Sequence, residues 1–412
     1  MHRKFRVELL LAFLGLGSAL VMFSLAGMSP AGAQAPDGLS NPLFLPVIMG
    51  GQSAPSSQSS YVVIGWNDLG MHCYDRDYST LTVLPPYNNL FSQVIKRGDP
   101  PQVITTGVKV AYSFPDNTYS AGKTNFWDYA SKIFGANLSL NIGLTGKGLA
   151  GDMDSATNHF VAEGVPVTEF SDSAPTTPDY FQLARIVAKD LSGKVLAQTD
   201  VVAPVSSEMR CDVCHDEPSP TNFRMNILQK HDEEESTHLA AQANAGNPVL
   251  CAGCHADPAL GMTGNPNLPS LSAAMHGKHL GETNDCYACH PGPNTQCLRD
   301  VMSTQFGMTC TDCHQGGMLM LSDENRTPWV DEPRCADCHD AKHAENPGKL
   351  FKQSTGHGGL YCEACHNSTH AILTSREAKD NLQSIALQGY AGTISKCTVC
   401  HLTTPSSGGP HK

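Results

Sequence analysis

The chain has 412 residues and a formal net charge of −12, from 39 Asp and Glu against 27 Lys and Arg. Such an acidic chain lacks the basic face that nucleic-acid phosphates and anionic lipid head groups require. We therefore expect no nucleic-acid partner, and the 16 cysteines become the most informative part of the composition.

Residues 1–33 have the features of a signal peptide. A basic segment, 2–6, precedes an apolar stretch, 9–27, and Ala31-Gly32-Ala33 gives a small-residue cleavage pattern. An uncleaved anchor is the alternative, because the apolar stretch is about long enough to span a bilayer. The small-residue pattern favours cleavage. We expect an exported protein, periplasmic or extracellular, including the cell surface, whose mature form does not span the membrane.

Residues 34–60 are rich in Gly, Ser and Pro and are expected to form a linker. The following region, 61–208, holds one cysteine and short β-rich runs separated by Gly, Pro, Asn and Asp. Many short strands with such turns predict an antiparallel, sandwich-like domain. The last two runs flank residues 190–193, a turn sequence that predicts a hairpin. The predicted strands are Tyr61–Trp66, Thr80–Leu84, Gly107–Phe114, Phe160–Phe170, Phe181–Lys189 and Lys194–Pro204.

Residues 209–412 have a different pattern, in which short helical segments alternate with loops. We predict an α+β chain whose second domain is irregular and built from short helices. Within this region Cys-x-x-Cys-His occurs seven times. The motif cysteines are Cys211, Cys214, Cys251, Cys254, Cys286, Cys289, Cys310, Cys313, Cys335, Cys338, Cys362, Cys365, Cys397 and Cys400. The histidines that close the motifs are His215, His255, His290, His314, His339, His366 and His401.

The spacing of this motif suits covalent attachment of haem. Two cysteines three positions apart on a short turn can form thioethers to both haem vinyl groups, and the adjacent histidine then ligates the iron. A redox-active dithiol would need a thioredoxin-like βαβ context, which is absent from the sequence pattern. Neither a four-cysteine zinc site nor a structural disulfide requires the histidine that follows every copy. The motifs therefore predict seven covalent c-type haems.

On these seven motifs, residues 211–401 resemble the multihaem c-type cytochromes. The resemblance covers somewhat less than half of the chain. It implies haems packed in contact as a chain, along which electrons move between redox partner proteins or to an extracellular acceptor. Residues 66–73, which read Trp-Asn-Asp-Leu-Gly-Met-His-Cys, resemble a segment found ahead of the haem region in some of these proteins. No function is assigned to that segment.

Each iron needs a second axial ligand if it is to be six-coordinate. Seven further histidines lie within the haem region, which matches the number of motifs; the alternative for each is an ordinary surface histidine. These candidates are His231, His238, His276, His279, His343, His357 and His370.

The spacing of some candidates suggests how they are used. His343 and His370 each follow a motif histidine by four residues, which on a helix places both imidazoles on one face. The second imidazole would then serve a neighbouring haem rather than its own. His231 and His238 are expected two turns apart on a helix over Asn226–Gln242.

Met318 is a further axial candidate, because it follows His314 by four residues. Packing within its Gly-Gly-Met-Leu-Met segment is the simpler interpretation.

Two cysteines remain outside the motifs, Cys73 and Cys297. A disulfide between the two regions and a pair of free buried thiols are both compatible with an exported protein. His72, with Asp68, Asp75 and Asp77 nearby, suggests either a metal or haem-capping site or a polar loop of the β-rich domain.

Three functions are compatible with this pattern. The first is an electron-transfer protein, which the match of seven histidines to seven motifs favours. The second is a terminal oxidoreductase that acts on a small nitrogen or sulfur compound at one open haem. The absence of a Cys-x-x-Cys-Lys variant speaks against it. The third adds docking of the β-rich domain on a partner. No catalytic residue is assigned, and the pattern leaves a homo-oligomer open.

Overall fold

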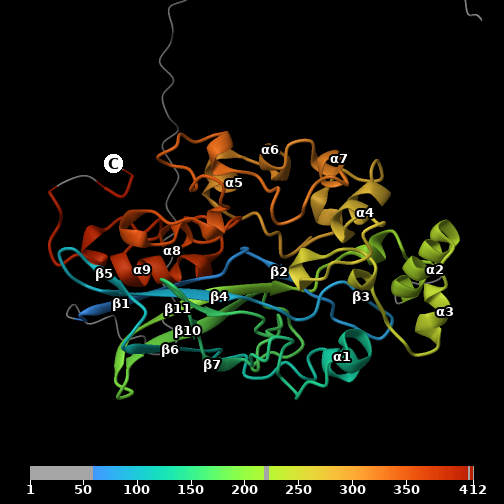
Figure 1. The fold of residues 1–412 in the computed structure, drawn as a ribbon, viewed down its shortest axis with the longest axis horizontal. Coiled ribbons are helices and arrows are strands. Elements are labelled where there is room, and N and C mark those ends of the chain that lie inside the picture. Colours follow the sequence, from blue (N-terminus) through green and yellow to red (C-terminus); the bar gives the residue numbers. More distant parts are fainter. Residues whose placement is uncertain (1–58, 218–221, 407–408, 412) are drawn as a thin grey trace, which may run out of the picture. The chain divides into compact units, whose positions relative to one another are not determined.

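The computed structural model describes residues 59–217, 222–406 and 409–411. The predicted signal peptide and nearly all of the predicted linker lie outside the described residues. Within them the fold is α+β, as predicted, with short helices and mixed sheets (Figure 1). No helix in the described part of the chain is long and apolar enough to cross a membrane.

The first of two five-stranded sheets has the order β1-β4-β9-β8, with β5 paired to β4, and all its neighbours are antiparallel. Its strands are β1 (Tyr61–Trp66), β4 (Leu90–Lys96), β5 (Gln102–Ile104), β8 (Asp154–Ser155) and β9 (Phe160–Ala162).

The second five-stranded sheet has the order β2-β11-β10-β6-β7. The hairpin predicted around residues 190–193 is confirmed, since Phe181 pairs with Pro204 and the register runs back to the turn. The prediction of a wholly antiparallel domain is wrong for this sheet, because β2 pairs with β11 in parallel. Its strands are β2 (His72–Cys73), β6 (Val108–Ser113), β7 (Ala150–Asp152), β10 (Phe181–Asp190) and β11 (Val195–Ser206).

Two predicted strands are much shorter than expected. The run from Phe160 ends at Ala162, because Gly164 takes a φ of +73° and turns the chain. The run Thr80–Leu84 yields only β3 (Leu81–Thr82). This strand pairs in parallel with β12 (Val249–Leu250), which belongs to the second half of the chain.

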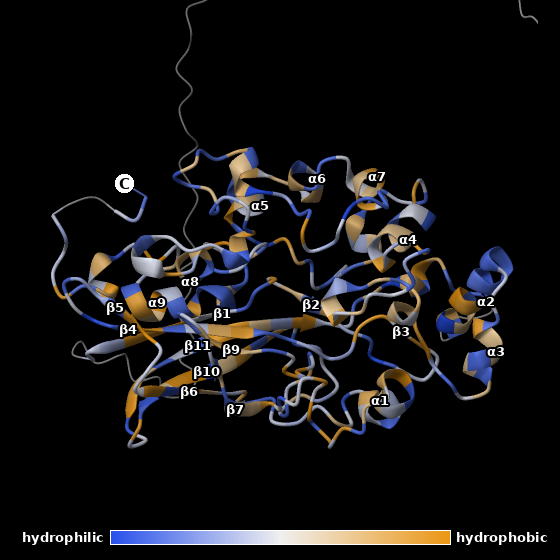
Figure 2. Ribbon diagram, in the orientation of Figure 1, coloured by the Kyte–Doolittle hydropathy of each residue, from blue (hydrophilic) through white to orange (hydrophobic). Residues whose placement is uncertain are grey.

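The two large sheets share one hydrophobic core. Inward residues alternate along β10, as expected for a strand with one buried face. Strand β1 differs, because it is buried on both faces. Val63 contributes to the core between the sheets, whereas Ile64 and Trp66 pack against Leu360 and Ala364 from the second half of the chain. Figure 2 shows these central strands as mainly hydrophobic.

The second half of the chain is built from short helical segments, and α8 and α9 lie against the sheets (Figure 1). The α-helices are α1 (Phe126–Phe134), in the β-rich region, and α2 (Phe223–Glu235), α3 (Leu239–Asn244), α4 (Leu271–Lys278), α5 (Val301–Phe306), α6 (Cys310–Cys313), α7 (Gly317–Leu321), α8 (Cys362–His366) and α9 (Leu382–Gln388). The 3-10 turns are η1 (Cys211–Val213), η3 (Cys251–Gly253), η4 (Pro258–Leu260), η5 (Cys286–Ala288), η6 (Cys335–Asp337), η7 (Phe351–Gln353), η8 (His357–Gly359), η9 (Ala378–Asn381) and η10 (Cys397–Val399).

The predicted helix over Asn226–Gln242 is wrong in its length. Helix α2 ends at Glu235, because Ser236 takes a φ of 55°, and a second helix, α3, begins only at Leu239. His231 lies on α2, whereas His238 caps the start of α3, so the two histidines do not share one helix.

A helix following His339 or His366 is likewise not formed. Residues 340–343 are irregular, and α8 ends at His366 before Asn367 and His370, which both take positive φ.

Arg299 joins distant parts of the chain through a buried ion pair. Its Nε and Nη2 donate to the two carboxylate oxygens of Asp380 at 2.6 and 3.0 Å, and both side chains are 1% exposed. Its Nη1 donates to the carbonyl oxygen of Gly70, at the edge of the β-rich region. Removal of one partner of such a pair leaves a buried charge without compensation.

We predict that Arg299→Gln lowers the free energy of unfolding by about 3–5 kcal/mol, measured by guanidinium denaturation followed by circular dichroism. The matched control is Arg185→Gln, whose partner is Asp200 and whose side chain is 38% exposed. This control should cost less than about 1 kcal/mol. Equal losses in the two variants would contradict the assignment of Arg299 as a buried tether.

Candidate haem-binding sites

All seven motifs adopt the same local structure, a single helical turn. In six of them the backbone N–H of the histidine donates to the carbonyl of the first cysteine, at distances from 2.7 Å for His339 to 3.2 Å for His290. In the seventh, His366 is the last residue of α8. One turn therefore carries both thiols and the imidazole in every copy.

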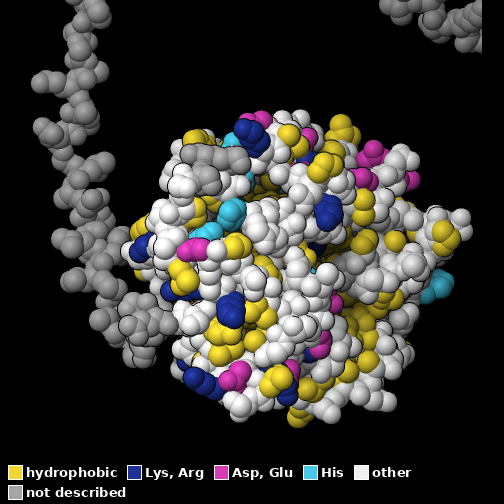
Figure 3. Space-filling view, turned by 60° about the vertical axis from the view of Figure 1, so that its left-hand side comes forward, with side chains coloured by type: hydrophobic (Ala, Val, Ile, Leu, Met, Phe, Trp, Pro, Cys, Tyr) yellow, Lys and Arg dark blue, Asp and Glu magenta, His cyan; other side chains and the backbone are white. Residues whose placement is uncertain are grey.

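The motif thiols are accessible to a ligand. The first cysteine of each motif is half-buried, and in five motifs the second is exposed. Histidine side chains also reach the surface on the face drawn in Figure 3, where they adjoin hydrophobic side chains.

Six motif histidines face a second imidazole. Two imidazoles that ligate one iron from opposite sides have ring centroids about 6 Å apart, because each metal–nitrogen bond is about 2 Å and each centroid lies about 1 Å beyond its nitrogen. The observed centroid separations are 6.2 Å for His215 and His279, 6.4 Å for His255 and His231, 6.2 Å for His290 and His276, 6.4 Å for His314 and His370, 5.8 Å for His366 and His411, and 6.0 Å for His401 and His357.

In eight of these twelve rings Nδ1 makes a hydrogen bond, which leaves Nε2 available for a metal. An iron-ligating histidine ordinarily gives its other ring nitrogen to a carbonyl, carboxylate or similar partner. Here Nδ1 makes that contact: His276 bonds the Ser272 carbonyl at 2.7 Å, and His279 bonds the Met275 carbonyl at 2.7 Å. The same holds for His215 with Asn226, His231 with Thr237, His255 with the Pro269 carbonyl, and His411 with the Lys342 carbonyl. Ring spacing and donor set therefore fit haem.

Thiols of different motifs interact electrostatically. In each of six pairs, burial raises the pKa of one thiol, and a thiol of another motif raises it further. The pairs are Cys251 with Cys211, Cys289 with Cys214, Cys310 with Cys286, Cys313 with Cys338, Cys335 with Cys362, and Cys365 with Cys400. These interactions connect the motifs in a series that follows the sequence order, apart from an exchange of the first two.

Five of the seven predicted second-ligand histidines face a motif histidine, and two do not. His343 instead faces His411, with ring centroids 5.0 Å apart. His238 is exposed and meets no aromatic ring within the described residues. His411, which follows the last motif, was not among the predicted second ligands; in the sequence it is a histidine at the end of a Gly- and Pro-containing tail.

Met318 is not on the helix of His314, because α6 ends at Cys313 and α7 begins at Gly317. The ring that faces His314 belongs to His370.

Residues 66–73 support the second half of the chain. His370 forms a hydrogen bond with the backbone of Leu69, and burial lowers the pKa of His370 to about 4. His72 lies with its Nε2 3.0 Å from Asp68 Oδ1, so the nitrogen used by the other rings to face a partner is engaged here. This segment therefore positions a candidate ligand and does not supply one.

The acidic residues Asp75 and Asp77, beside His72, accept hydrogen bonds within the β-rich region. Asp75 accepts the N–H groups of Val83 and Leu84, and its burial raises its pKa to about 6. Asp77 accepts from Asn125 at 2.7 Å. The described residues contain no group of three or more His, Cys, Asp or Glu arranged to hold a metal ion. Haem iron takes at most two protein ligands, so a pair of imidazoles that ligates haem does not form a group of three.

Cys73 and Cys297 are neighbours, and both carry free thiols in this structure. Burial raises the pKa of Cys73 to about 12, and Cys297 contributes to that rise.

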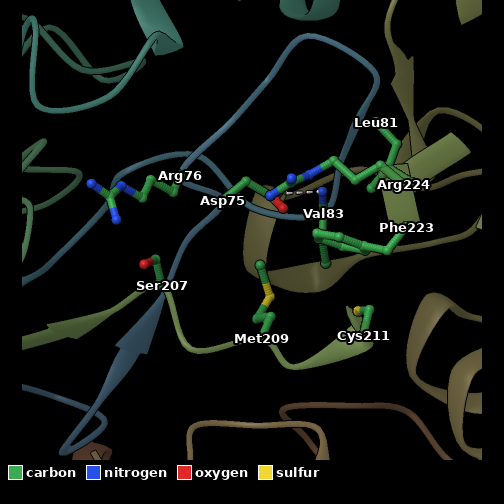
Figure 4. A pocket seen from close by; sticks show the side chains of 9 residues that line it. All are labelled: Asp75, Arg76, Leu81, Val83, Ser207, Met209, Cys211, Phe223 and Arg224. Carbon is green, nitrogen blue, oxygen red and sulfur yellow. Dashed lines mark hydrogen bonds between the residues drawn. The ribbon is translucent and has the colours of Figure 1, made fainter. Parts of the chain in front are cut away.

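A small pocket adjoins the first motif (Figure 4). It encloses about 20 Å³, which is room for little more than one water molecule. Cys211, Met209 and Phe223 line it on one side, with Asp75 opposite. Its size makes it part of the packing around Cys211, with no space for a substrate.

No protein-family model, curated protein or solved structure matches this chain. The assignment of the sites therefore depends on the motifs and on the geometry described above.

We predict that His276→Ala converts one haem of the exported protein from low spin to high spin, because the ring opposite His290 is removed. The measurement is electron paramagnetic resonance of the oxidised protein. His238→Ala is the matched control and should leave the spectrum unchanged. If both variants gain a high-spin signal, or neither does, the pairing of His276 with His290 is wrong.

Proposed function

We propose that this chain is an exported heptahaem c-type cytochrome that transfers electrons along a linear series of covalently bound haems. Its architecture is a sandwich-like β domain, about residues 61–208, followed by a heptahaem domain, 209–412. The observation that carries the proposal is the unbroken order of seven Cys-x-x-Cys-His turns, six of which oppose a second imidazole at 5.8–6.4 Å.

The residues of each site have separate roles. The two cysteines would anchor the haem edge through thioethers, and the motif histidine would ligate the iron. When bound, haem c supplies one-electron redox chemistry. The second imidazole would keep both oxidation states six-coordinate, which limits the structural change that accompanies electron transfer. Backbone and side-chain acceptors at Nδ1 hold the rings in place, as Ser272 does for His276.

The two ends of the linear order are natural exchange points. One end is the motif of Cys251 and Cys254, packed near α2 and α3, and the other is the motif of Cys397 and Cys400, beside β4 and β5. Redox partner proteins or an extracellular acceptor would exchange electrons there, and the β domain would contribute a docking face.

The second candidate function is a terminal oxidoreductase acting on a small nitrogen or sulfur compound. One observation favours it: His339 is exposed and faces no second imidazole among the described residues.

We predict that deletion of a central haem interrupts conduction, whereas deletion of an end haem does not. Cys310→Ala/Cys313→Ala leaves three motifs on each side of the gap, and Cys397→Ala/Cys400→Ala leaves six in series. Fast-scan voltammetry of adsorbed protein should count about three electroactive haems in the central variant and about six in the end variant, because transfer across the gap slows steeply with distance.

Mass spectrometry of both variants provides the control, since each should retain six haems. Equal fast-scan charge in the two variants would contradict a linear path and favour a branched or independent arrangement of the haems.

A further inference from the structure

One of the seven sites differs from the others, and the inference drawn from it rests on the proposed function. Every histidine after residue 58 lies among the described residues. Six motif histidines have such a ring. His339 has none in this part of the chain, and no hydrogen bond to its imidazole is formed there either.

The two histidines that remain cannot complete this site. His238 is exposed at the start of α3, next to Asp232. His343 is only four residues from His339, but its Nδ1 is held 2.7 Å from Asp340 and its ring packs on His411. His411 in turn faces His366, so His343 packs on the ring that is opposite the next motif. Neither His343 nor His411 faces His339.

The surroundings of His339 are open to solvent. Cys338, His339 and Asp340 are all exposed, whereas five of the other motif histidines are at least half-buried. On the other side of the turn, Glu345 lies against the backbone between Cys335 and Cys338. One carboxylate oxygen of Glu345 accepts from the Ala336 N–H at 3.3 Å, and the other is buried without a hydrogen-bond partner among the described residues.

We propose that the haem attached at Cys335 and Cys338 keeps one axial position free of protein and binds a small lone-pair ligand there, of the size of carbon monoxide or hydroxylamine. His339 is the only protein ligand of that iron, and Glu345 holds a half-buried carboxyl against the backbone of the same turn. The position within the proposed series matters, because this motif lies between the motif of Cys310 and Cys313 and the motif of Cys362 and Cys365 in the sequence. An exchangeable ligand at this site would receive or give electrons through both neighbouring haems.

The test uses the exported, haem-loaded protein. Electron paramagnetic resonance of the oxidised form should show one high-spin haem and six low-spin haems, and added imidazole should convert the high-spin haem to low spin. After reduction, carbon monoxide should bind once per chain, measured by difference absorbance. Cys335→Ala/Cys338→Ala should lose both the high-spin signal and carbon monoxide binding.

Two variants locate the site. Cys310→Ala/Cys313→Ala, which removes a haem with a paired imidazole, should keep the carbon monoxide site. The double variant His343→Ala/His411→Ala should create a second one at the haem of His366. Seven low-spin haems in the native protein would overturn this inference and leave the proposed function intact. Carbon monoxide binding that persists in Cys335→Ala/Cys338→Ala would also overturn it. A protein with no covalent haem would overturn the proposed function itself.

Discussion

Residues 274–349 are all described and carry three of the seven motifs, yet none of their Ala, Val, Ile, Leu, Met, Phe, Trp, Tyr or Cys side chains is buried. A segment of this length gains too little from apolar burial to offset its conformational entropy. Other interactions must therefore stabilise the folded conformation of this segment. The facing imidazoles leave gaps about 6 Å between centroids, which suits a flat, apolar ring system ligated from both sides. In the proposed function, the haems serve as both the redox centres and the core of this half of the chain.

The β-rich half provides hydrophobic packing against which the second half of the chain lies. Strand β1 buries one face between the sheets and the other against Leu360 and Ala364, so the two halves share a hydrophobic cluster. Candidate ligands are also held across this boundary, since the Leu69 backbone contacts His370 and Asp99 lies 3.3 Å from the Nδ1 of His401. The boundary predicted near residue 208 stays a prediction. The two halves contact each other through residues that would ligate iron, such as His370 and His401.

The sequence predicted the motif turns and the main strands well, because each is set by a local pattern. Strand β4 was missed for a clear reason: Ser92 and Gln93 are fully buried in it, so its polarity hides a core strand. Gln93 is satisfied by distant backbone, including the Tyr361 N–H. The helices expected after His339 and His366 do not form: residues 340–343 are irregular, and Asn367 takes a positive φ directly after α8.

The choice of facing imidazole could not be predicted from spacing. His276 and His279 lie three residues apart near the end of α4, yet they face the motifs of His290 and His215. Such pairings depend on how irregular segments return to one another, and no local periodicity encodes them. Counting seven spare histidines for seven motifs predicted seven second ligands, but only six motif histidines face another ring. His238 and His343 face no motif histidine among the described residues, and His411, which faces His366, was not counted.

The most direct test of the central claim is the intact mass of the protein purified after export from a host with haem-attachment machinery. The account predicts a mass equal to the mature polypeptide plus seven haems, unchanged by thiol reductants, because thioether bonds are not reducible. A mass equal to the polypeptide alone, or one that carries fewer than seven haems, would contradict it.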